Sequence, residues 1–365
     1  MRIAFLGDIA LIGQYDLTQN SLARNRLKKI AGKLAEFDYV VANLESPLTD
    51  ITKTMVCKSM HLKTPTVNVE LLKYLNIDAV SLANNHLYDY GVQGLNDTIT
   101  TLEQCNIEWF GANSKFLIKE IGGEKVCFSG FCCYSTNGSG YKEGNSKKGI
   151  NTLTYDNIML QLDIDRNNGA FSVMSFHWGD EHTNYPKYEH VCLAEALAQK
   201  KDVVICGHHP HIIQGVQKNK NSLVAYSLGN CLFDDCVSIT GSITLRQNQN
   251  NKKSFIFDVN IENATIDSYK YHGFKDEQNG LDFFNIDDEM SRISEPLRLI
   301  DNVDEYDAMR MKQINTVLIE KFGKKSLQWL ISRLNFYSVG AYISAKFRKK
   351  KYLREIEKFL DGRWI

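Results

Sequence analysis

The chain has 365 residues, of which 43% are hydrophobic, so it can build one large domain or one domain with an appendage. Lys plus Arg and Asp plus Glu both number 43, and this balance excludes a global attraction to nucleic acid, anionic membranes or acidic polymers. Any electrostatic preference must therefore be local.

The first residues, "MRIAFLGD", lack the basic segment, apolar segment and cleavage site of a secretory signal. No uncharged apolar stretch reaches the length of a membrane span, and we expect a cytoplasmic protein. The nine cysteines form no Cys-x-x-Cys pair. We therefore expect reduced, mostly buried thiols and neither a disulfide framework nor a zinc ribbon.

Short apolar or β-branched runs then alternate with helical patterns. The strand patterns are "RIAFLG" (2–7), "YVVANLE" (39–45), "DAVSLANNH" (78–86), "EKVCFSGFCC" (124–133), "FSVMSFHW" (171–178) and "DVVICGHH" (202–209). The helical patterns are "LARNRLKKIAGKLAEF" (22–37), "VELLKYLN" (69–76), "GLNDTITTLEQC" (94–105) and "HVCLAEALAQK" (190–200). This alternation predicts a largely parallel sheet covered by helices, with the chemistry in loops at the carboxyl ends of the strands.

The pattern changes in the last third of the chain. Residues 238–274 alternate like strands around a polar Asn/Gln/Lys turn, which predicts an antiparallel β element. Residues 276–308 are rich in Asp and Glu, whereas the end of the chain is basic with helical spacing. We therefore predict a domain at 1–275 and a helical extension with a basic end at 276–365.

Five of the strand patterns end in residue types that bind metals or catalyse reactions. These residues are Asp8; Asn43 and Glu45; Asn84, Asn85 and His86; His177; and His208, His209 and His211. Taken singly, each has a simpler interpretation: Asp8 as a helix cap, Glu45 as a solvated acid, or His177 as a core histidine. The recurrence of such residues at one topological position favours a shared site.

Carboxylate, amide and imidazole ligands together suit Mn²⁺, Fe²⁺ or Zn²⁺, and they do not suit Ca²⁺, which takes oxygen ligands. A carboxylate that bridges two such ions would offset their repulsion. No thiolate lies at a strand end, so the pattern predicts an open, catalytic centre.

Spacing separates the roles of the histidines. His209 and His211 alternate as i and i+2, so in an extended segment they would face one side, with Pro210 fixing the chain between them and His208 pointing elsewhere. His86 follows an asparagine that can bind a metal through its side-chain oxygen. It could therefore act as a general acid without binding the metal itself.

Six ordered blocks resemble the CapA family of poly-γ-glutamate capsule biosynthesis proteins. The blocks are "GDIALIG", "VVANLESPLTD", "DAVSLANNHLYDYGVQGLNDTITTLEQCNIEWFGA", "SFHWGDEHTNYPKYEH", "DVVICGHHPHIIQGV" and "VAYSLGNCLFDD". The resemblance runs from Met1 to about Asp235.

That family is similar to the calcineurin-like metallophosphoesterases. The resemblance implies a four-layer α/β/β/α sandwich, here with a helical C-terminal extension, and two divalent ions at the strand ends. It implies metal ligands at Asp8, Glu45 (bridging), Asn85, His177, His209 and His211. It implies His86 as the acid, with Asn84 and His208 in the same catalytic group, and a pocket lined or supported by Asn43, Trp178, Gly179, Glu181, Ser227 and Asn230.

The sequence departs from these patterns at two positions. The phosphoesterases usually open with Asp-x-His, but the residue two after Asp8 is Ala10. The metal site would then bind its ions more weakly, hold a single ion, or be completed by His208 or Glu181. In the block "SLGN", the aromatic residue usual in the family is replaced by Cys231, which affects packing more than chemistry.

The segment 310–360 has two interpretations. Its helical spacing and basic end fit a helical pair packed on the domain with solvated lysines. They also fit docking to an anionic membrane surface or to a partner in a biosynthetic complex.

The leading functional hypothesis is a cytoplasmic metal-dependent hydrolase in capsule or exopolymer biosynthesis, acting on a phosphorylated or γ-glutamyl substrate, with no role for nucleic acid. The alternative is a non-catalytic component that binds polymer or partner enzymes through the same cleft. A ligase or transferase step is implied only by the name of the family, because no nucleotide-binding fingerprint is present.

Overall fold

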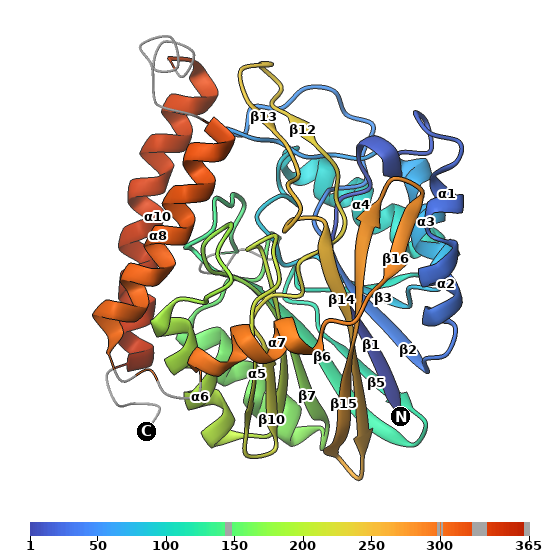
Figure 1. The fold of residues 1–365 in the computed structure, drawn as a ribbon, viewed down its shortest axis with the longest axis vertical. Helices are drawn as coiled ribbons and strands as arrows, with labels where there is room; N and C mark the ends of the chain where they lie inside the picture. The colour runs from blue at the N-terminus through green and yellow to red at the C-terminus, as the bar shows by residue number, and fades with distance from the viewer. Residues whose placement is uncertain (143–147, 298–299, 301, 323–333, 361–365) are drawn as a thin grey trace.

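Two β-sheets pack face to face in the computed structural model, which describes residues 1–142, 148–297, 300, 302–322 and 334–360 (Figure 1). The first sheet has the order β16 (Gly280–Phe283), β15 (Thr265–Glu277), β14 (Lys253–Glu262), β1 (Arg2–Ile9), β2 (Tyr39–Leu44), β3 (Ala79–Ser81) and β4 (Glu108–Phe110), and β11 (Asn230–Leu232) also pairs with β1. The second has the order β5 (Leu117–Ile121), β6 (Glu124–Cys132), β7 (Phe171–His177), β8 (Val203–His208), β10 (Ser222–Ala225) and β9 (Val216–Asn219).

Helices cover the outer face of each sheet. The first sheet is covered by α1 (Ala23–Arg26), α2 (Lys28–Leu34), α3 (Val69–Tyr74) and α4 (Gly91–Gln104). The second is covered by α5 (Tyr155–Asn167) and α6 (Tyr188–Lys200). The C-terminal helices are α7 (Asp287–Ser294), α8 (Val303–Phe322) and α10 (Phe336–Leu360), and short 3-10 turns lie at Gly13–Tyr15, Thr66–Asn68 and Glu295–Leu297.

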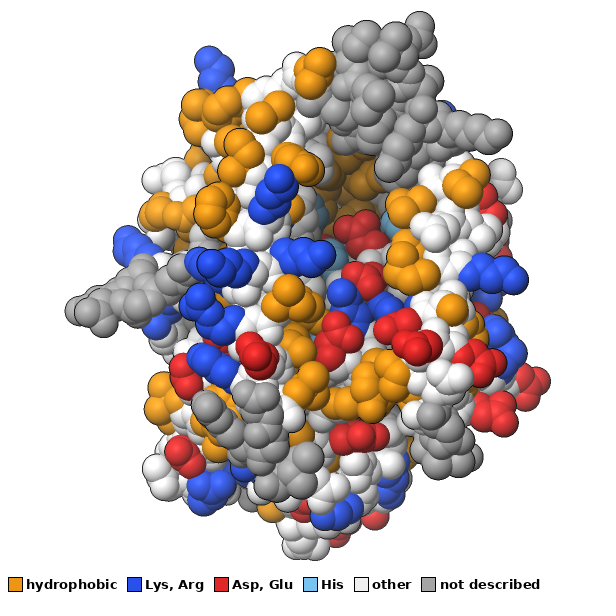
Figure 2. Space-filling view, turned by 90° about the vertical axis from the view of Figure 1, so that its left-hand side faces the viewer, with side chains coloured by type: hydrophobic (Ala, Val, Ile, Leu, Met, Phe, Trp, Pro, Cys, Tyr) orange, Lys and Arg blue, Asp and Glu red, His pale blue; other side chains and the backbone are white. Residues whose placement is uncertain are grey.

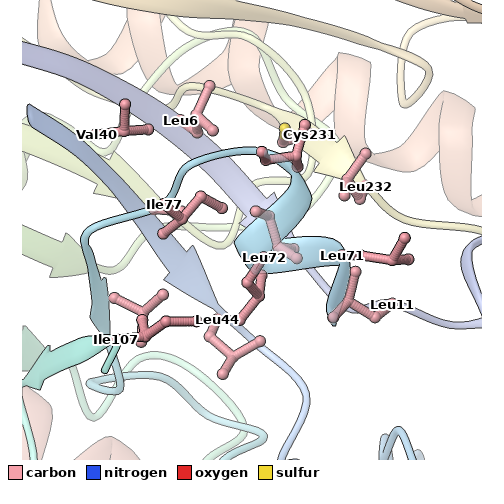
Figure 3. Packing of buried hydrophobic residues seen from close by; sticks show 14 of the residues in the cluster. Leu6, Leu11, Val40, Leu44, Leu71, Leu72, Ile77, Ile107, Cys231 and Leu232 are labelled. Carbon is pink, nitrogen blue, oxygen red and sulfur yellow. The ribbon is translucent and has the colours of Figure 1, made fainter. Parts of the chain in front are cut away.

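The side chains of β1 show why these layers form. Successive residues of a strand point to opposite faces of the sheet. Ala4 and Leu6 therefore join the cluster under the helices, whereas Ile3 and Phe5 join the cluster between the two sheets. Figure 3 shows the first cluster, in which leucines of α3 lie against side chains of the strands. The expected four-layer α/β/β/α sandwich with a helical C-terminal segment is confirmed.

Within each sheet, the central strands run parallel. β1 to β4 are parallel to one another, and so are β6, β7, β8 and β10. Their carboxyl ends therefore meet at one edge of the sandwich. The expected antiparallel element is formed by β14 and β15, and a separate small hairpin joins β12 (Cys236–Val237) to β13 (Thr244–Leu245).

A close backbone contact sits just before the first site residue. β1 shifts its register against β2 between Leu6 and Asp8, and the nitrogen of Asp8 donates a hydrogen bond to the carbonyl of Gly229. A Cβ atom on Gly7 would lie 2.0 Å from that same carbonyl oxygen. Only glycine therefore allows β11 to approach β1 closely enough to bring Asn230 beside Asp8.

Helices α8 and α10 rest on the second sheet's side of the sandwich, whereas α7 packs against the cluster between the sheets (Figure 1). Tyr352, Ile356 and Phe359 of α10 belong to the cluster that includes α5 and α6. The division at residue 275 stays a prediction, and we note that β16 of the first sheet lies on its C-terminal side. In the described part of the chain, no helix combines the length and apolarity needed to cross a membrane.

Candidate metal centre

Four carboxyl ends bring polar residues to one edge of the sandwich. Asp8 lies near the end of β1, Glu45 directly follows β2, and His177 and His208 end β7 and β8. None of the four residues is more than 3% exposed. The two sheets thus deliver carboxylates from one side and imidazoles from the other.

Asp8 is held by its neighbours on both sheets. Its Oδ1 accepts a hydrogen bond of 2.8 Å from Asn43 Nδ2, and its Oδ2 accepts one of 3.2 Å from the backbone nitrogen of His209. His208 Nδ1 lies 3.2 Å from Oδ1, and His211 Nδ1 lies 3.4 Å from Oδ2. The carboxylate is therefore fixed in orientation at the centre of the cluster.

Glu45 is the group that most clearly lacks a partner. Both of its carboxylate oxygens are buried, and neither takes part in a hydrogen bond. Its Oε1 lies 3.7 Å from His177 Nε2 and 3.6 Å from His211 Nε2. A buried carboxylate without a hydrogen-bond donor is costly to the fold, so this site favours a bound cation.

Three sets of donor atoms could hold a cation in the described part of the chain. They are Glu45, His177 and His209; Glu181, His209 and His211; and Asp8, Glu45 and His211. Within each set the donor atoms lie within 4.8 Å of one another. Glu45, His209 and His211 each occur twice, so the sets adjoin one another and are compatible with either one ion or two.

The ionisation of the cluster agrees with this interpretation. Burial raises the pKa of Glu45 well above its usual range, and the Asp8 carboxylate raises it further. Although burial alone would lower it, the Glu45 and Asp8 carboxylates raise the pKa of His211 to about 10. In the absence of a metal, protons are the positive charges that this cluster gathers. Borderline divalent ions prefer these same nitrogen and oxygen donors, so the residues fit such an ion.

The backbone between the histidines differs from our expectation. β8 ends at His208, and His209 and His211 have φ angles of 96° and 59°, so the segment is not extended. The two rings nevertheless come within 5.8 Å of each other. Their proximity was predicted correctly, but the stated reason was wrong: two left-handed residues around Pro210 turn the chain, at a cost in backbone strain.

Asn85 lies at the metal cluster, and Asn84 supports it from behind. Asn85 Oδ1 lies 2.9 Å from His177 Nε2. Asn84 donates to the carbonyl of Leu44 and accepts from the backbone nitrogens of His86 and Leu87. Its side chain is thus fully used in holding the turn after β3.

Ala10 is buried in an apolar cluster, where the related phosphoesterases carry a histidine. Its neighbours in that cluster include Met60 and Phe233, so the surroundings of the position are apolar. Glu181, predicted as a pocket residue, does line the pocket, and its carboxylate also forms a donor set with His209 and His211. His208 belongs to none of the three donor sets and contacts Asp8, whereas Glu181 belongs to one of them.

A buried charge network lies directly behind His86. Its Nδ1 is 2.6 Å from Asp89 Oδ2 and 3.2 Å from Lys58 Nζ. Lys58 also donates to Asp89 Oδ1 at 2.5 Å and to the carbonyl of Asn85 at 2.6 Å. The shorter contact assigns the Nδ1 proton of His86 to a hydrogen bond with Asp89.

This network keeps the His86 ring neutral. Burial and the Lys58 ammonium lower the pKa of His86 to about 4. Burial alone would raise the pKa of Asp89, but Lys58 and His86 lower it overall. With its proton on Nδ1, the neutral ring has an unprotonated Nε2.

Sequence reasoning missed Lys58 and Asp89. Asp89 follows His86 by three residues in "NNHLYDYG", a spacing that could have marked it as a partner. Lys58 lies in a segment without regular structure and gave no comparable signal.

Other predicted pocket residues lie behind the site. Asn43 bonds Asp8, and Asn230 Oδ1 lies 2.9 Å from His211 Nδ1. Trp178 is in the core, where its ring stacks on His190 with centroids 4.8 Å apart. Ser227 is fully buried, and Gly179 forms a turn with a φ of 93°. The structure thus brings the predicted ligands together but does not place Trp178, Gly179 or Ser227 in the pocket lining.

A pocket with a cavity volume of about 160 Å³ opens beside the cluster. Asn85, His86, Glu181 and His211 face it from the metal side. Its other walls are apolar at Met60, Leu62, Phe233 and Ile243, and polar at Asn137, Gln247 and Asn251. Figure 2 shows a hollow on the side of the molecule that carries α8 and α10, with acidic and histidine side chains visible inside it.

The fold and the site together define a class of protein: a four-layer sandwich of metallophosphoesterase type with a carboxylate and histidine cluster at the strand ends. Residues 2–235 match the family described as "Bacterial capsule synthesis protein PGA_cap". The chain therefore belongs to this family, and the expected membership is confirmed.

Several curated proteins are similar to the chain. The "PGA biosynthesis protein CapA" of Bacillus subtilis (strain 168) is 29% identical over 241 residues, which cover 63% of this chain and 63% of the relative. The "Capsule biosynthesis protein CapA" of Bacillus anthracis is 29% identical over 57% of this chain and 53% of the relative. A "Probable polyglutamine synthesis accessory protein" of Mycobacterium tuberculosis is 25% identical over 57% of this chain and 59% of the relative. The chain thus spans less than two thirds of these relatives.

Solved structures show only distant similarity. A hypothetical protein from Thermus thermophilus is 14% identical over 75% of this chain and 99% of that chain, with a TM-score of 0.45. The sulfate thiohydrolase SoxB of the same species, in complex with glycerol, is 11% identical over 86% of this chain and 60% of that chain, with a TM-score of 0.40.

Proposed function

We propose that the protein is a metal-dependent hydrolase that acts in capsule or exopolymer biosynthesis on a phosphorylated or γ-glutamyl substrate. The observation that carries the proposal is the pair of buried, unpartnered oxygens of Glu45 among the rings of His177, His209 and His211. The biosynthetic setting is taken from the names of the relatives, among them a polyglutamine synthesis accessory protein.

Asp8, Glu45, His177, His209, His211 and Glu181 would hold the metal, with Asn85 as a further oxygen ligand. A divalent ion bound there would act as a Lewis acid toward a phosphoryl or carbonyl oxygen. Water is kept from one side of the pocket by the apolar wall of Met60, Leu62 and Phe233. Asn137 and Gln247 line the same pocket, where they would contact a polar substrate.

His86 would move the proton. Because its ring is neutral and its Nδ1 proton is bonded to Asp89, His86 would first accept a proton from the attacking water at Nε2 and then donate that proton to the leaving group. Asp89 would stabilise the cation formed in between, and Lys58 would hold Asp89 in place. The predicted general acid is thus proposed to act first as a base.

A second candidate function is a non-catalytic component that binds polymer or partner enzymes through the same cleft. The observation that favours it is Ala10, which replaces a metal-binding imidazole of the related enzymes with a buried methyl group. A binding component has no need of bound transition metal, so metal content separates the two candidates.

The test begins with metal analysis of protein purified without chelators. It continues with a hydrolysis screen over phosphomonoesters, phosphodiesters and γ-glutamyl amides. We expect about one or two ions per chain, hydrolysis of one substrate class, and loss of both properties in Glu45→Ala. The matched control is Glu70→Ala on the surface of α3, which should keep both. Protein without stoichiometric metal, or a Glu45→Ala variant that retains hydrolysis, would refute the hydrolase.

A further inference from the structure

The solvent side of α10 carries large apolar side chains that nothing in the described structure covers. Phe336, Val339, Ile343 and Phe347 recur at spacings of three and four residues, so they form one stripe along the helix. Phe347 is 67% exposed, and Tyr342, beside the stripe, is 65% exposed. We call this set the apolar stripe. Its residues remain in water in the isolated protein, which is unfavourable for side chains of this size.

Basic residues continue the same side of the helix. Lys350 and Arg354 extend the stripe by the same spacing, and Lys346 and Lys349 flank it. All four are exposed and none forms an ion pair with an acid in the described residues, while Lys346 lies over the ring of Tyr342. Within α10, Glu357 is the only exposed acidic residue. Figure 2 shows hydrophobic side chains gathered on this side of the molecule, with Lys and Arg side chains next to them.

We propose that this side of α10 lies on an anionic membrane surface, with the apolar stripe inserted at the interface and the basic residues against lipid headgroups. Aromatic and aliphatic side chains next to lysines and arginines are the combination that binds such interfaces. A second copy of the chain is a poorer occupant, because either direction of pairing would set the lysines against each other or against the apolar stripe.

The opposite side of α10 contacts the segment 54–61, which contributes Ser59 and Met60 to the pocket, and the pocket residue Asn137. Tyr337 Oη donates a hydrogen bond of 3.0 Å to the carbonyl of Thr54, and its ring lies 5.3 Å from that of His61. Arg348 Nη2 donates a bond of 2.6 Å to Oδ1 of Asn137, which lines the pocket. Membrane docking would therefore hold the pocket close to the bilayer. A substrate attached to the membrane or leaving it would then reach the site directly.

The experiment is co-sedimentation of the full chain with vesicles of phosphatidylcholine alone or of phosphatidylcholine with phosphatidylglycerol. We expect binding to the anionic vesicles only, and weaker binding at high salt because ions screen the lysines. Chelation of metal should leave this binding unchanged, since the stripe contacts no metal ligand. A failure of the proposed hydrolase is thus distinguishable from a failure of membrane docking.

Two variants and two matched controls locate the surface. Lys346→Glu with Lys350→Glu should weaken vesicle binding about tenfold or more, and Ile343→Ser with Phe347→Ser should weaken it to a similar degree. Lys28→Glu with Lys218→Glu, and Leu160→Ser, alter exposed side chains elsewhere and should bind as wild type does. Circular dichroism should show that each variant is folded.

Three results would overturn the proposal. One is absence of binding to either kind of vesicle. Another is binding that the α10 variants leave unchanged, which would place the membrane contact elsewhere. The third is a dimer in solution that Ile343→Ser with Phe347→Ser dissociates, which would make the stripe an interface between copies.

Discussion

At the carboxyl ends of the strands, polar atoms are buried beyond what the protein's own hydrogen bonds satisfy, whereas on α10 apolar side chains are exposed to water without cover. Glu45 has no donor for either oxygen, and Phe347 is 67% exposed. Each arrangement is unfavourable in the isolated chain. Each therefore fits a proposed binding partner: a cation in the first region and an anionic membrane surface in the second.

The two regions also differ in what fixes them. The metal cluster is set by paired strands, by a glycine at residue 7 and by two left-handed histidines, all within the part of the chain that matches the family. Helix α10 lies outside that part and is anchored through single side chains such as Tyr352 and Arg348. Substitutions in the first region should affect metal binding, catalysis and folding, whereas those on the outer side of α10 should affect only binding to the membrane.

His209→Ala should have the largest effect. The histidine belongs to two of the three donor sets, so its loss should remove bound metal and lower hydrolysis by about a thousandfold, or about 4 kcal/mol. Metal content and kcat/KM check this together. The control is His272→Ala, which alters a partly buried histidine beside Asp258 on the first sheet. Equal losses in the two variants would contradict a metal role for His209.

Lys58→Met should be the most destabilising change behind the site. Lys58 and Asp89 are almost completely buried and 2.5 Å apart, so the variant leaves the buried Asp89 carboxylate without its cation. We expect a loss of about 3–5 kcal/mol in the free energy of unfolding, measured with urea. The double variant with Asp89→Leu should recover part of it. The exposed Lys73, paired with Glu70, is the control, and Lys73→Met should cost less than about 1 kcal/mol. A cost for Lys58→Met no greater than for Lys73→Met would refute the role of the network.

The same network predicts a dependence of stability on acid. The folded-state pKa of Asp89 lies below its ordinary value of 3.8, because Lys58 and His86 outweigh burial. The ionised Asp89 therefore contributes its full stability above pH 3.8, and this stability is lost as the pH falls through the folded-state pKa. Each unit of difference between the unfolded-state and folded-state pKa values contributes about 1.4 kcal/mol to the free energy of unfolding. The difference in free energy of unfolding between wild type and Asp89→Asn should be constant from about pH 7 to 5 and shrink below about pH 4. The exposed Asp163→Asn should show a small difference throughout. A difference for Asp89→Asn that grows toward acid would reverse the sign and contradict the assignment.

The strand ends were predictable because their physics is local. Alternating apolar runs mark parallel strands, and parallel strands in one sheet end at one edge, so Asp8 and Glu45 had to lie close together once the strands were placed. His177 reaches them from the second sheet, whose packing on the first no alternating run predicts. The sequence also indicated the antiparallel pair after residue 250 and the helical end of the chain. The four layers themselves were expected from the family resemblance.

Other features depend on contacts between distant segments. Lys58 lies in an irregular segment, and only the fold shows that it reaches Asp89 and Asn85. Trp178 follows His177 but packs on the side of the sheet away from the pocket, because neighbouring residues of a strand point in opposite directions. The positive φ angles of His209 and His211 have no sequence signal, since neither residue is a glycine.

The smallest effects on stability and kinetics should come from substitutions of two neighbouring residues of α10 that face in opposite directions. Arg348 points inward and holds Asn137 and the carbonyl of Gly138, whereas Lys349 is exposed. Arg348→Met should lower the free energy of unfolding by about 1 kcal/mol, and it should raise KM more than it lowers kcat, because Asn137 lines the pocket but touches no reacting group. Lys349→Met should leave stability within about 0.5 kcal/mol of wild type and leave both kinetic constants unchanged. It should still weaken binding to anionic vesicles, since its charge faces the proposed membrane. If Lys349→Met changed KM as much as Arg348→Met, the two sides of the helix would not have separate roles. The outer side of α10 would then affect the pocket as well as the proposed membrane contact, and the distinction between the two regions would be wrong.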